Sequence, residues 1–284
     1  MRIALCIGNL AATGRHGGAA YELGYKHLNK NIISKYNNVD IFLHSYEPEL
    51  KNILHKIYNP VYSIFENRHD FSEYTNKLDP FIASQSIQNY ETIFSMFYSR
   101  FVVGDLKKKY ELKHNFKYDW VIFARYDLTS AFHIVDLPFN AELDNNFLYS
   151  AMFDQINAGP MDQWFYGNSS DMDKLFSLYL NLNEYFQYDS EYINASKNWF
   201  DSNKNDRFSC EIFKTQKCDE PEALPYNTLI NAHYLYKWHL YKNGMWNLNK
   251  LKFTLTPHLL TDCYRLMPQI DILKTHKNIV SFLE

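Results

Sequence analysis

Cysteine is scarce in this sequence and shows no metal-binding pattern. The four cysteines stand apart, and no CxxC pair occurs. A structural zinc site is therefore not expected. Cys6 lies in an apolar run, where we expect it to pack as a small hydrophobic residue. Cys210 and Cys218 are close enough in sequence for a local disulfide, whereas Cys263 stands alone, and a reduced cytosolic protein is the simpler interpretation.

Long apolar runs and long basic runs are also missing. No stretch of about 18 apolar residues occurs, so we expect no membrane-spanning helix. The apolar run at 3–7 is too short for a secretory signal. We expect a cytoplasmic protein, with peripheral association at the inner face of a membrane left open. The formal net charge is only −3 and no long basic run occurs, which argues against nucleic acid as the main partner.

Aromatic residues, in contrast, are abundant. They make up 17% of the chain, with 23 Tyr and 21 Phe. Such a composition fits a core built on aromatic side chains. It also fits exposed rings that stack on sugars or nucleobases, and composition alone does not separate the two.

Apolar runs alternate with helical periodicities through the first half of the chain, which predicts a Rossmann-type α/β/α sandwich with a mainly parallel central sheet. The C-terminal part is expected to be more helical. We expect a single domain over 1–284, with two halves at 1–130 and 131–284. Strands are predicted at 3–7, 39–44, 61–65, 118–124, 147–152 and 251–256, and helices at 19–35, 49–57, 81–113 (as two helices meeting near Gly104), 171–185 and 221–238.

The loop after the first strand is rich in glycine. It runs from Gly8 to Gly18 and contains Arg15, whose planar guanidinium could pair with a diphosphate. Glycines let the backbone approach a ligand closely, and free amides before a helix favour anions. The spacing matches neither GxGxxG nor a Walker loop. A flexible turn is therefore an equally good interpretation.

Arg125, Tyr126 and Asp127 follow the best strand candidate in the chain. Ligands of parallel sheets bind beyond the carboxyl ends of the strands. There Asp127 could ligate a divalent cation that bridges two phosphates. His258 follows the last predicted strand and could be a second ligand. The alternatives are a turn with a surface ion pair at 125–127, and a surface or core histidine at 258.

Asp162 precedes three consecutive aromatic residues, Trp164, Phe165 and Tyr166. In an extended segment Asp162, Trp164 and Tyr166 would share one side. That side could hold a sugar between aromatic rings and a carboxylate. The alternatives are that Trp164 belongs to the core and that Asp162 is a loop residue exposed to water.

Three pieces of sequence, in this order, resemble a family of bacterial polysaccharide glycosyltransferases with a GT-A-like fold. The pieces are VDIFLHSY at 39–46, YDWVIFARYDL at 118–128 and DQWFYGNSSDM at 162–172. The resemblance covers roughly residues 1–180. It implies transfer of a sugar from a UDP- or GDP-linked donor to a glycan or lipid-linked glycan acceptor, in capsule or lipopolysaccharide synthesis. The chain departs from the usual Asp-x-Asp motif, because Arg125 stands where the first Asp would be.

The resemblance and the residue chemistry together assign roles. The expected nucleotide-binding residues are Gly8, Arg15 and His44, while Arg125 and Asp127 would hold the diphosphate. An inverting enzyme needs a carboxylate that deprotonates the acceptor hydroxyl, for which Asp162 is the first candidate and Glu222 the second. A divalent cation, Mn²⁺ or Mg²⁺, would be held by Asp127 and His258. The alternatives are another α/β transferase, such as a sulfo- or methyltransferase, and a non-catalytic component of a polysaccharide assembly complex.

Overall fold

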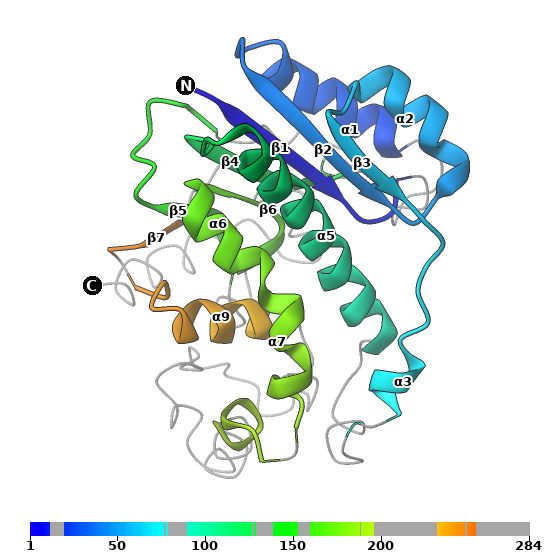
Figure 1. Ribbon diagram of the computed structural model, residues 1–284. Helices are drawn as coiled ribbons and strands as arrows, with labels where there is room; N and C mark the ends of the chain where they lie inside the picture. The colour runs from blue at the N-terminus through cyan, green and yellow to red at the C-terminus, as the bar shows by residue number, and fades with distance from the viewer. Residues whose placement is uncertain are drawn as a thin grey trace, which may run out of the picture.

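The protein is described as a computed structural model over residues 1–11, 20–76, 78, 90–126, 128, 139–152, 160–187, 189–195, 232–247 and 249–253. These residues form a seven-stranded sheet in the order β3-β2-β1-β4-β6-β5-β7, flanked by helices (Figure 1). The strands are β1 (Ile3–Gly8), β2 (Val39–Ser45), β3 (Tyr62–Phe65), β4 (Trp120–Arg125), β5 (Leu148–Met152), β6 (Pro160–Gly167) and β7 (Leu251–Phe253).

The helices fall into two groups along the chain. The first group comprises α1 (Ala20–Leu28), which continues as the π-helical turn η1 (Asn29–Ile33), then the short η2 (Pro48–Leu50), α2 (Lys51–Tyr58) and α3 (Ser72–Thr75). The second comprises α5 (Tyr90–His114), α6 (Ser169–Phe176), α7 (Leu178–Tyr185) and α9 (Ala232–Lys242). No helix in the described ranges is both long and apolar enough to cross a bilayer.

Six of the seven strands run in the same direction. Strands β1 to β4 pair in parallel, whereas β6 is antiparallel to both β4 and β5, and β5 is parallel to β7. Only β6 is therefore reversed in this sheet. The predicted α/β/α sandwich with a mainly parallel sheet is confirmed.

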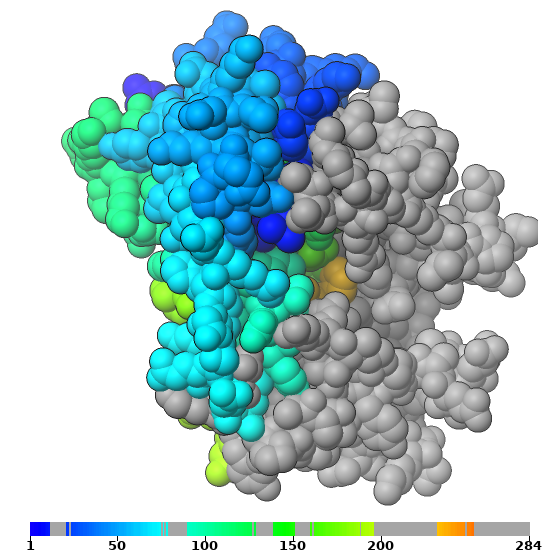
Figure 2. Space-filling view, turned by 90° about the vertical axis from the view of Figure 1, so that its right-hand side faces the viewer, coloured from blue at the N-terminus to red at the C-terminus, as the bar shows by residue number. Residues whose placement is uncertain are grey.

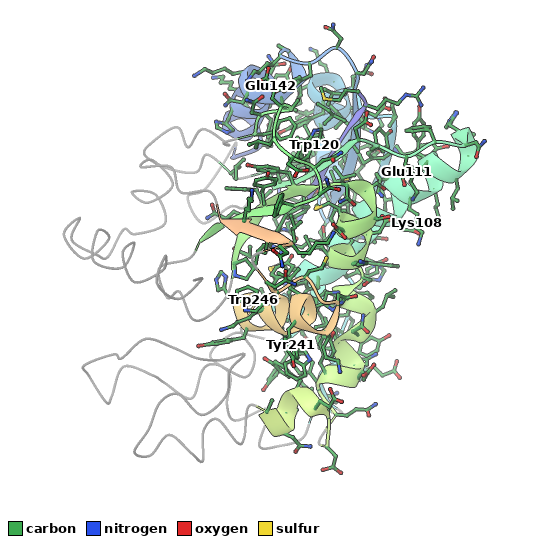
Figure 3. The ribbon with its side chains drawn as sticks, turned by 90° about the vertical axis from the view of Figure 1, so that its left-hand side faces the viewer. Lys108, Glu111, Trp120, Glu142, Tyr241 and Trp246 are labelled. Carbon is green, nitrogen blue, oxygen red and sulfur yellow. The ribbon has the colours of Figure 1, made fainter. Side chains whose placement is uncertain are left out.

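Each central strand sends alternate side chains into two separate cores. From β1, Ile3, Leu5 and Ile7 join the core beneath α1 and α2, while Ala4 and Cys6 join the core beneath α5 and α6. Figure 3 shows the sandwich from another side, with Trp120 of β4 and Glu111 of α5 labelled. Phe, Tyr and Trp supply 14 of the 31 buried residues of one core and 8 of the 20 of the other, so many of the abundant aromatic residues serve the interior. Cys6 is buried as a free thiol, as predicted.

Helix α5 runs without a break through Gly104, so the prediction of two helices meeting there is wrong. A Cβ atom at Gly104 would lie 2.5 Å from the Phe176 ring of α6. The glycine serves close packing of two helices and does not end either of them. Residues 81–89, also predicted as helical, lie outside the described residues.

The predicted helix at 171–185 is instead two helices, α6 and α7, separated by Ser177. The Ser177 hydroxyl donates to the Lys174 carbonyl at 2.7 Å, which competes with regular helical hydrogen bonding at the join. The Asn168 side chain caps the start of α6 by accepting from the Asp171 amide at 2.9 Å. Of the other predicted elements, residues 221–231 and 254–256 lie outside the described residues, as do Cys210, Cys218 and Cys263.

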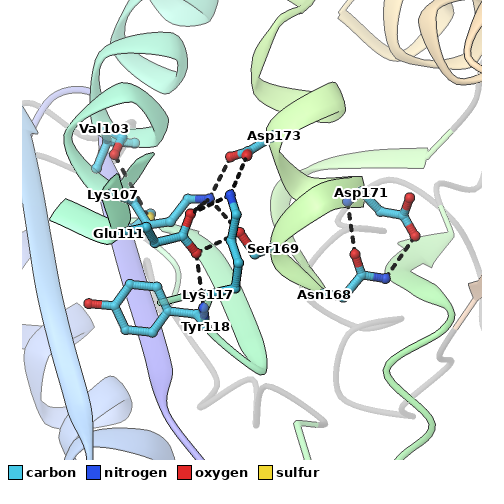
Figure 4. Close-up of polar contacts among 10 residues, drawn as sticks. Val103, Lys107, Glu111, Lys117, Tyr118, Asn168, Ser169, Asp171 and Asp173 are labelled. Carbon is cyan, nitrogen blue, oxygen red and sulfur yellow. Dashed lines mark hydrogen bonds and ion pairs between the residues drawn. The ribbon is translucent and has the colours of Figure 1, made fainter. Parts of the chain in front are cut away.

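A buried charged cluster joins α5 to the start of α6 (Figure 4). The Lys107 ammonium donates to Ser169 at 2.8 Å and to Glu111 at 3.2 Å, and it also contacts Asp173. The Glu111 carboxylate accepts from Ser169 and from the Tyr118 amide, just before β4. Because the charges are paired and hydrogen-bonded, they can stay buried. The cluster therefore fixes the amino end of β4 against α5 and α6.

Candidate functional site at the carboxyl ends of the strands

Polar residues from five segments meet where the parallel strands end. Gly8 ends β1 and Asn9 follows it, while Ser45 ends β2, with Glu47 two residues beyond it. Glu66 follows β3, and Arg125 ends β4. Strand β6 runs in the opposite direction, with Trp164 opposite Ala124, so its start brings Asp162 to the same edge. In Figure 2, dark blue atoms from the start of the chain and orange atoms of the α9 region reach the surface within one small area.

Asp162 and two arginines form the charged centre of this edge. Its Oδ2 accepts from Arg125 Nη1 at 3.2 Å and from Arg100 Nη2 at 3.1 Å. Arg100 comes from α5 and also donates to the Asp162 carbonyl at 2.7 Å and to the Tyr236 hydroxyl of α9. Its side chain is 2% exposed, whereas the Arg125 side chain is 25% exposed. The predicted residues Arg125 and Asp162 are thus in direct contact, and Arg125 is the more accessible of the two guanidinium groups.

The electrostatics of Asp162 differ from those of a proton acceptor. Burial raises the pKa of this carboxyl, but the adjacent Arg125 and Arg100 outweigh burial and hold the pKa well below its usual range. A general base works best when its pKa lies near the operating pH. In this geometry the Asp162 carboxylate is a weak base and a strong ion-pair acceptor. The catalytic role of Asp162 stays a prediction.

The aromatic residues beside Asp162 do not form an exposed sugar platform. Trp164, Phe165 and Tyr166 are all fully buried, so the alternative that Trp164 belongs to the core is confirmed. Trp164 and Tyr166 stack on each other in the core beneath α1 and α2, while Phe165 faces the other core. Asp162 pairs with Arg100 of α5, which packs on the Phe165 side. The expectation that Asp162 stays with Trp164 and Tyr166 is therefore wrong.

The loop after β1 begins with backbone amides that are already used. The Asn9 amide donates to the Ser99 hydroxyl at 2.8 Å, and the Ala11 amide donates to the Glu47 carboxylate. The idea of free, anion-binding amides is therefore wrong for these two positions. Packing alone also explains a glycine at position 8, since a Cβ there would lie 3.0 Å from Ser99 Oγ. It permits α5 to approach β1 closely.

His44 is fully buried at the end of β2, with both ring nitrogens engaged. Nδ1 lies 2.7 Å from Ser99 Oγ, and Nε2 lies 3.0 Å from Glu66 Oε1. Burial lowers the pKa of His44, although Glu66 opposes the shift. The ring therefore stays neutral near pH 7 and presents no nitrogen to a ligand. The role of His44 in nucleotide binding stays a prediction. In that role His44 would act through the residues it contacts.

Four other predicted site residues, Arg15, Asp127, Glu222 and His258, lie outside the described residues. The metal site was predicted on Asp127 and His258, so it stays a prediction. Among the described residues, no three His, Cys, Asp or Glu side chains are grouped to hold a metal ion. The described charged centre supplies two guanidinium groups around one carboxylate. Guanidinium groups suit phosphate oxygens.

Three residues of this site were missed from the sequence. Arg100 and Ser99 lie within α5, between the aromatic residues Phe97 and Phe101. A charged residue among aromatic residues of a helix is the available signal for Arg100, since a buried arginine is costly unless it is paired. Ser99 gave no signal. Glu66 lies in a polar stretch after β3, where a carboxylate is unremarkable in sequence.

These observations define the class, an α/β protein with a polar cluster at the carboxyl ends of a mainly parallel sheet. Residues 1–147, just over half of the chain, match the model of a domain family of unknown function, DUF7796, and the chain belongs to this family. No curated protein gives a match. Among solved structures, the apo crystal structure of mouse xyloside xylosyltransferase 1 is similar over 93% of this chain and 90% of that chain, with 12% identity and a TM-score of 0.41. At this level the likeness carries no argument about activity.

Proposed function

We propose that the protein is a GT-A-like glycosyltransferase that takes its sugar from a nucleotide-sugar donor. One observation carries the proposal. The three pieces of sequence that resemble the polysaccharide glycosyltransferases lie at separate places in the chain, 39–46, 118–128 and 162–172, yet each has a residue at the same edge of the sheet. These residues are His44, Arg125 and Asp162. Ligands of open α/β sheets bind at such an edge.

Arg125 is the residue proposed to contact the donor diphosphate. It is partly exposed at the end of a buried strand, so its guanidinium is both rigidly placed and accessible. A guanidinium can make two parallel hydrogen bonds to phosphate oxygens. Asp162 orients the Arg125 guanidinium through the 3.2 Å contact between Asp162 Oδ2 and Arg125 Nη1. Asp127, with or without Mn²⁺ or Mg²⁺ and His258, and Arg15 remain proposed as further diphosphate ligands. Glu222 remains the second proposed base.

The acceptor and the biological setting follow only from the resemblance. We propose a UDP- or GDP-linked donor and a glycan or lipid-linked glycan acceptor, in the synthesis of a surface polysaccharide. The halves 1–130 and 131–284 would bind donor and acceptor respectively. A cytoplasmic location, with peripheral contact at the inner face of the membrane, is part of the same proposal.

A thermal-shift screen with UDP, GDP, CMP, adenosine cofactors and Mn²⁺ tests the donor class. A ligand that binds the folded state raises the melting temperature. We expect UDP or GDP to do so. Stabilisation by an adenosine cofactor alone would point to another α/β transferase, and no stabilisation by any nucleotide would point to a non-catalytic component.

The Arg125→Ala variant then tests the site. Loss of one charge-assisted hydrogen bond should weaken nucleotide binding by about 10- to 100-fold. Arg2→Ala is the matched control, because Arg2 lies at the opposite end of the sheet with its guanidinium over the Phe116 ring. Equal affinity in the Arg125 and Arg2 variants would remove Arg125 from the donor site.

A further inference from the structure

A chain of hydrogen bonds links the segment after β3 to the loop after β1. Glu66 Oε1 lies 3.0 Å from His44 Nε2, and His44 Nδ1 lies 2.7 Å from Ser99 Oγ. The Ser99 oxygen in turn accepts from the Asn9 amide at 2.8 Å. His44 and Ser99 are fully buried, whereas the Glu66 side chain is 27% exposed. The chain therefore connects a partly exposed carboxylate to the backbone of a loop at the proposed donor site.

The direction of these hydrogen bonds follows from the groups involved. The Asn9 amide can only donate, so Ser99 Oγ accepts from it and directs its own hydrogen to His44 Nδ1. Neutral His44 then carries its proton on Nε2 and donates to Glu66. Burial opposes ionisation of Glu66, but hydrogen bonds from His44 and His69 outweigh burial and lower the pKa of this carboxyl. A carboxylate is the right acceptor for this end of the chain.

The contacts hold the backbone of residues 9–11 at both ends. Asn9 is held by Ser99, and Ala11 is held by the buried Glu47 carboxylate. Asn9 has a φ of 89°, in the left-handed region that is unfavourable for most residues other than glycine. Such a conformation persists only where surrounding contacts hold it. The loop after β1 therefore leaves the sheet in a direction set by side chains of α5 and of the β2 end.

The Ser99, His44 and Glu66 side chains resemble the order of groups in a hydrolase triad, but they cannot act as one. Ser99 lies within α5 and is fully buried. Its oxygen already accepts the Asn9 amide. A nucleophile must reach the substrate, so the arrangement positions backbone and does not attack a bond.

We infer that Ser99 and Glu66 are positioning residues for donor binding, acting through His44 to fix the backbone of Asn9–Ala11. The inference deepens the proposed function and rests on it. It gives His44 an indirect part in nucleotide recognition, consistent with its place in the sequence piece that resembles glycosyltransferases.

Ser99→Ala and Glu66→Ala break the series of hydrogen bonds at two points, while Glu66→Gln keeps an oxygen that accepts from His44. Ser169→Ala is the matched control, because Ser169 is also a buried serine but bonds to Lys107 and Glu111 in the cluster between α5 and α6. Two readouts are needed. Amide hydrogen exchange of the peptide covering residues 9–11 reports the loop, and titration with UDP and GDP reports donor binding.

In Ser99→Ala and Glu66→Ala, we expect faster exchange at residues 9–11 and nucleotide affinity reduced by roughly 3- to 10-fold, the scale of one lost hydrogen bond. Glu66→Gln should stay near wild type, and Ser169→Ala should lower the melting temperature without either effect. Unchanged exchange in Ser99→Ala would overturn the inference. Faster exchange with unchanged nucleotide affinity would mean that these hydrogen bonds have only a structural role, and it would overturn their part in donor binding. If neither UDP nor GDP binds the wild-type protein, the proposed function fails, and the donor part of the inference fails with it, while exchange still tests whether the loop is held.

Discussion

Replacing Asp162 with Asn distinguishes two roles for this carboxylate. The change keeps the shape of the side chain and the backbone carbonyl that Arg100 contacts, but it removes the charge shared by Arg100 and Arg125. Breaking a buried ion pair by removing one partner costs about 3–5 kcal/mol. We expect the low end, about 3 kcal/mol, because Arg125 and Asp162 are partly exposed, with side chains 25% and 17% exposed. At roughly 2 °C per kcal/mol for a chain of this length, the melting temperature should fall by about 6 °C.

The assay combines melting temperature with transfer kinetics. If Asp162 is a general base, turnover should fall by about 10²-fold or more while the melting temperature and donor affinity hardly change. If Asp162 holds the two arginines, stability should fall and donor affinity should change with it. Glu191→Gln is the control, since its ion pair with Lys242 lies at the surface and should contribute little. An Asp162→Asn protein that melts like wild type would refute the ion-pair reasoning.

The pH dependence of stability gives a second test of the same residue. Arg125 and Arg100 outweigh burial and hold the pKa of Asp162 below that of the unfolded chain. The unfolded state then binds more protons as the pH falls below about 4, so the stabilisation is complete above that pH and is lost progressively below it. The stability difference between wild type and Asp162→Asn should therefore be constant from about pH 8 to pH 5 and shrink in more acidic solution.

Three further predictions concern the framework of the fold. Gly104→Ala should lower the unfolding free energy by about 1–3 kcal/mol in denaturant titrations, because the added Cβ would clash with Phe176. Alanine favours a helix more than glycine does, so a stabilised variant would contradict this packing. Glu111→Gln should lower the unfolding free energy by about 3 kcal/mol or more, because it removes a carboxylate that pairs with the buried Lys107 ammonium. A loss under about 1 kcal/mol would be inconsistent with that pairing. Burial lowers the pKa of His239 from 6.5 to about 4. The unfolded state therefore binds the extra proton, and this histidine should make stability fall by up to about 3 kcal/mol as the pH drops from 6.5 to 4; a His239→Gln variant with the same acid sensitivity would refute the assignment.

Most of the fold could be predicted from the sequence because its signals are local. Continuous apolar runs such as 3–7 and 120–124 mark buried parallel strands, and the alternation of strands with helices fixes the class. The errors arose where a distant contact overrides a local signal. Gly104 was interpreted as a break, but Phe176, 72 residues later, is the reason for a glycine there. Trp164 and Tyr166 alternate correctly, yet the pattern does not say that both faces of β6 are covered.

Two residues of the candidate site, Arg125 and His44, could be predicted because they lie at the carboxyl ends of parallel strands. Such a strand end has a known position relative to the sheet. Ser99 has no such marker, since it lies within a long helix, and only its contact with Asn9, 90 residues earlier, makes it part of the site. Asp162 was found by its residue type, but its low pKa depends on Arg125 and on Arg100, which lie 37 and 62 residues earlier. Residue chemistry therefore predicts which groups could take part in this site, whereas their protonation and their roles depend on contacts that sequence spacing does not encode.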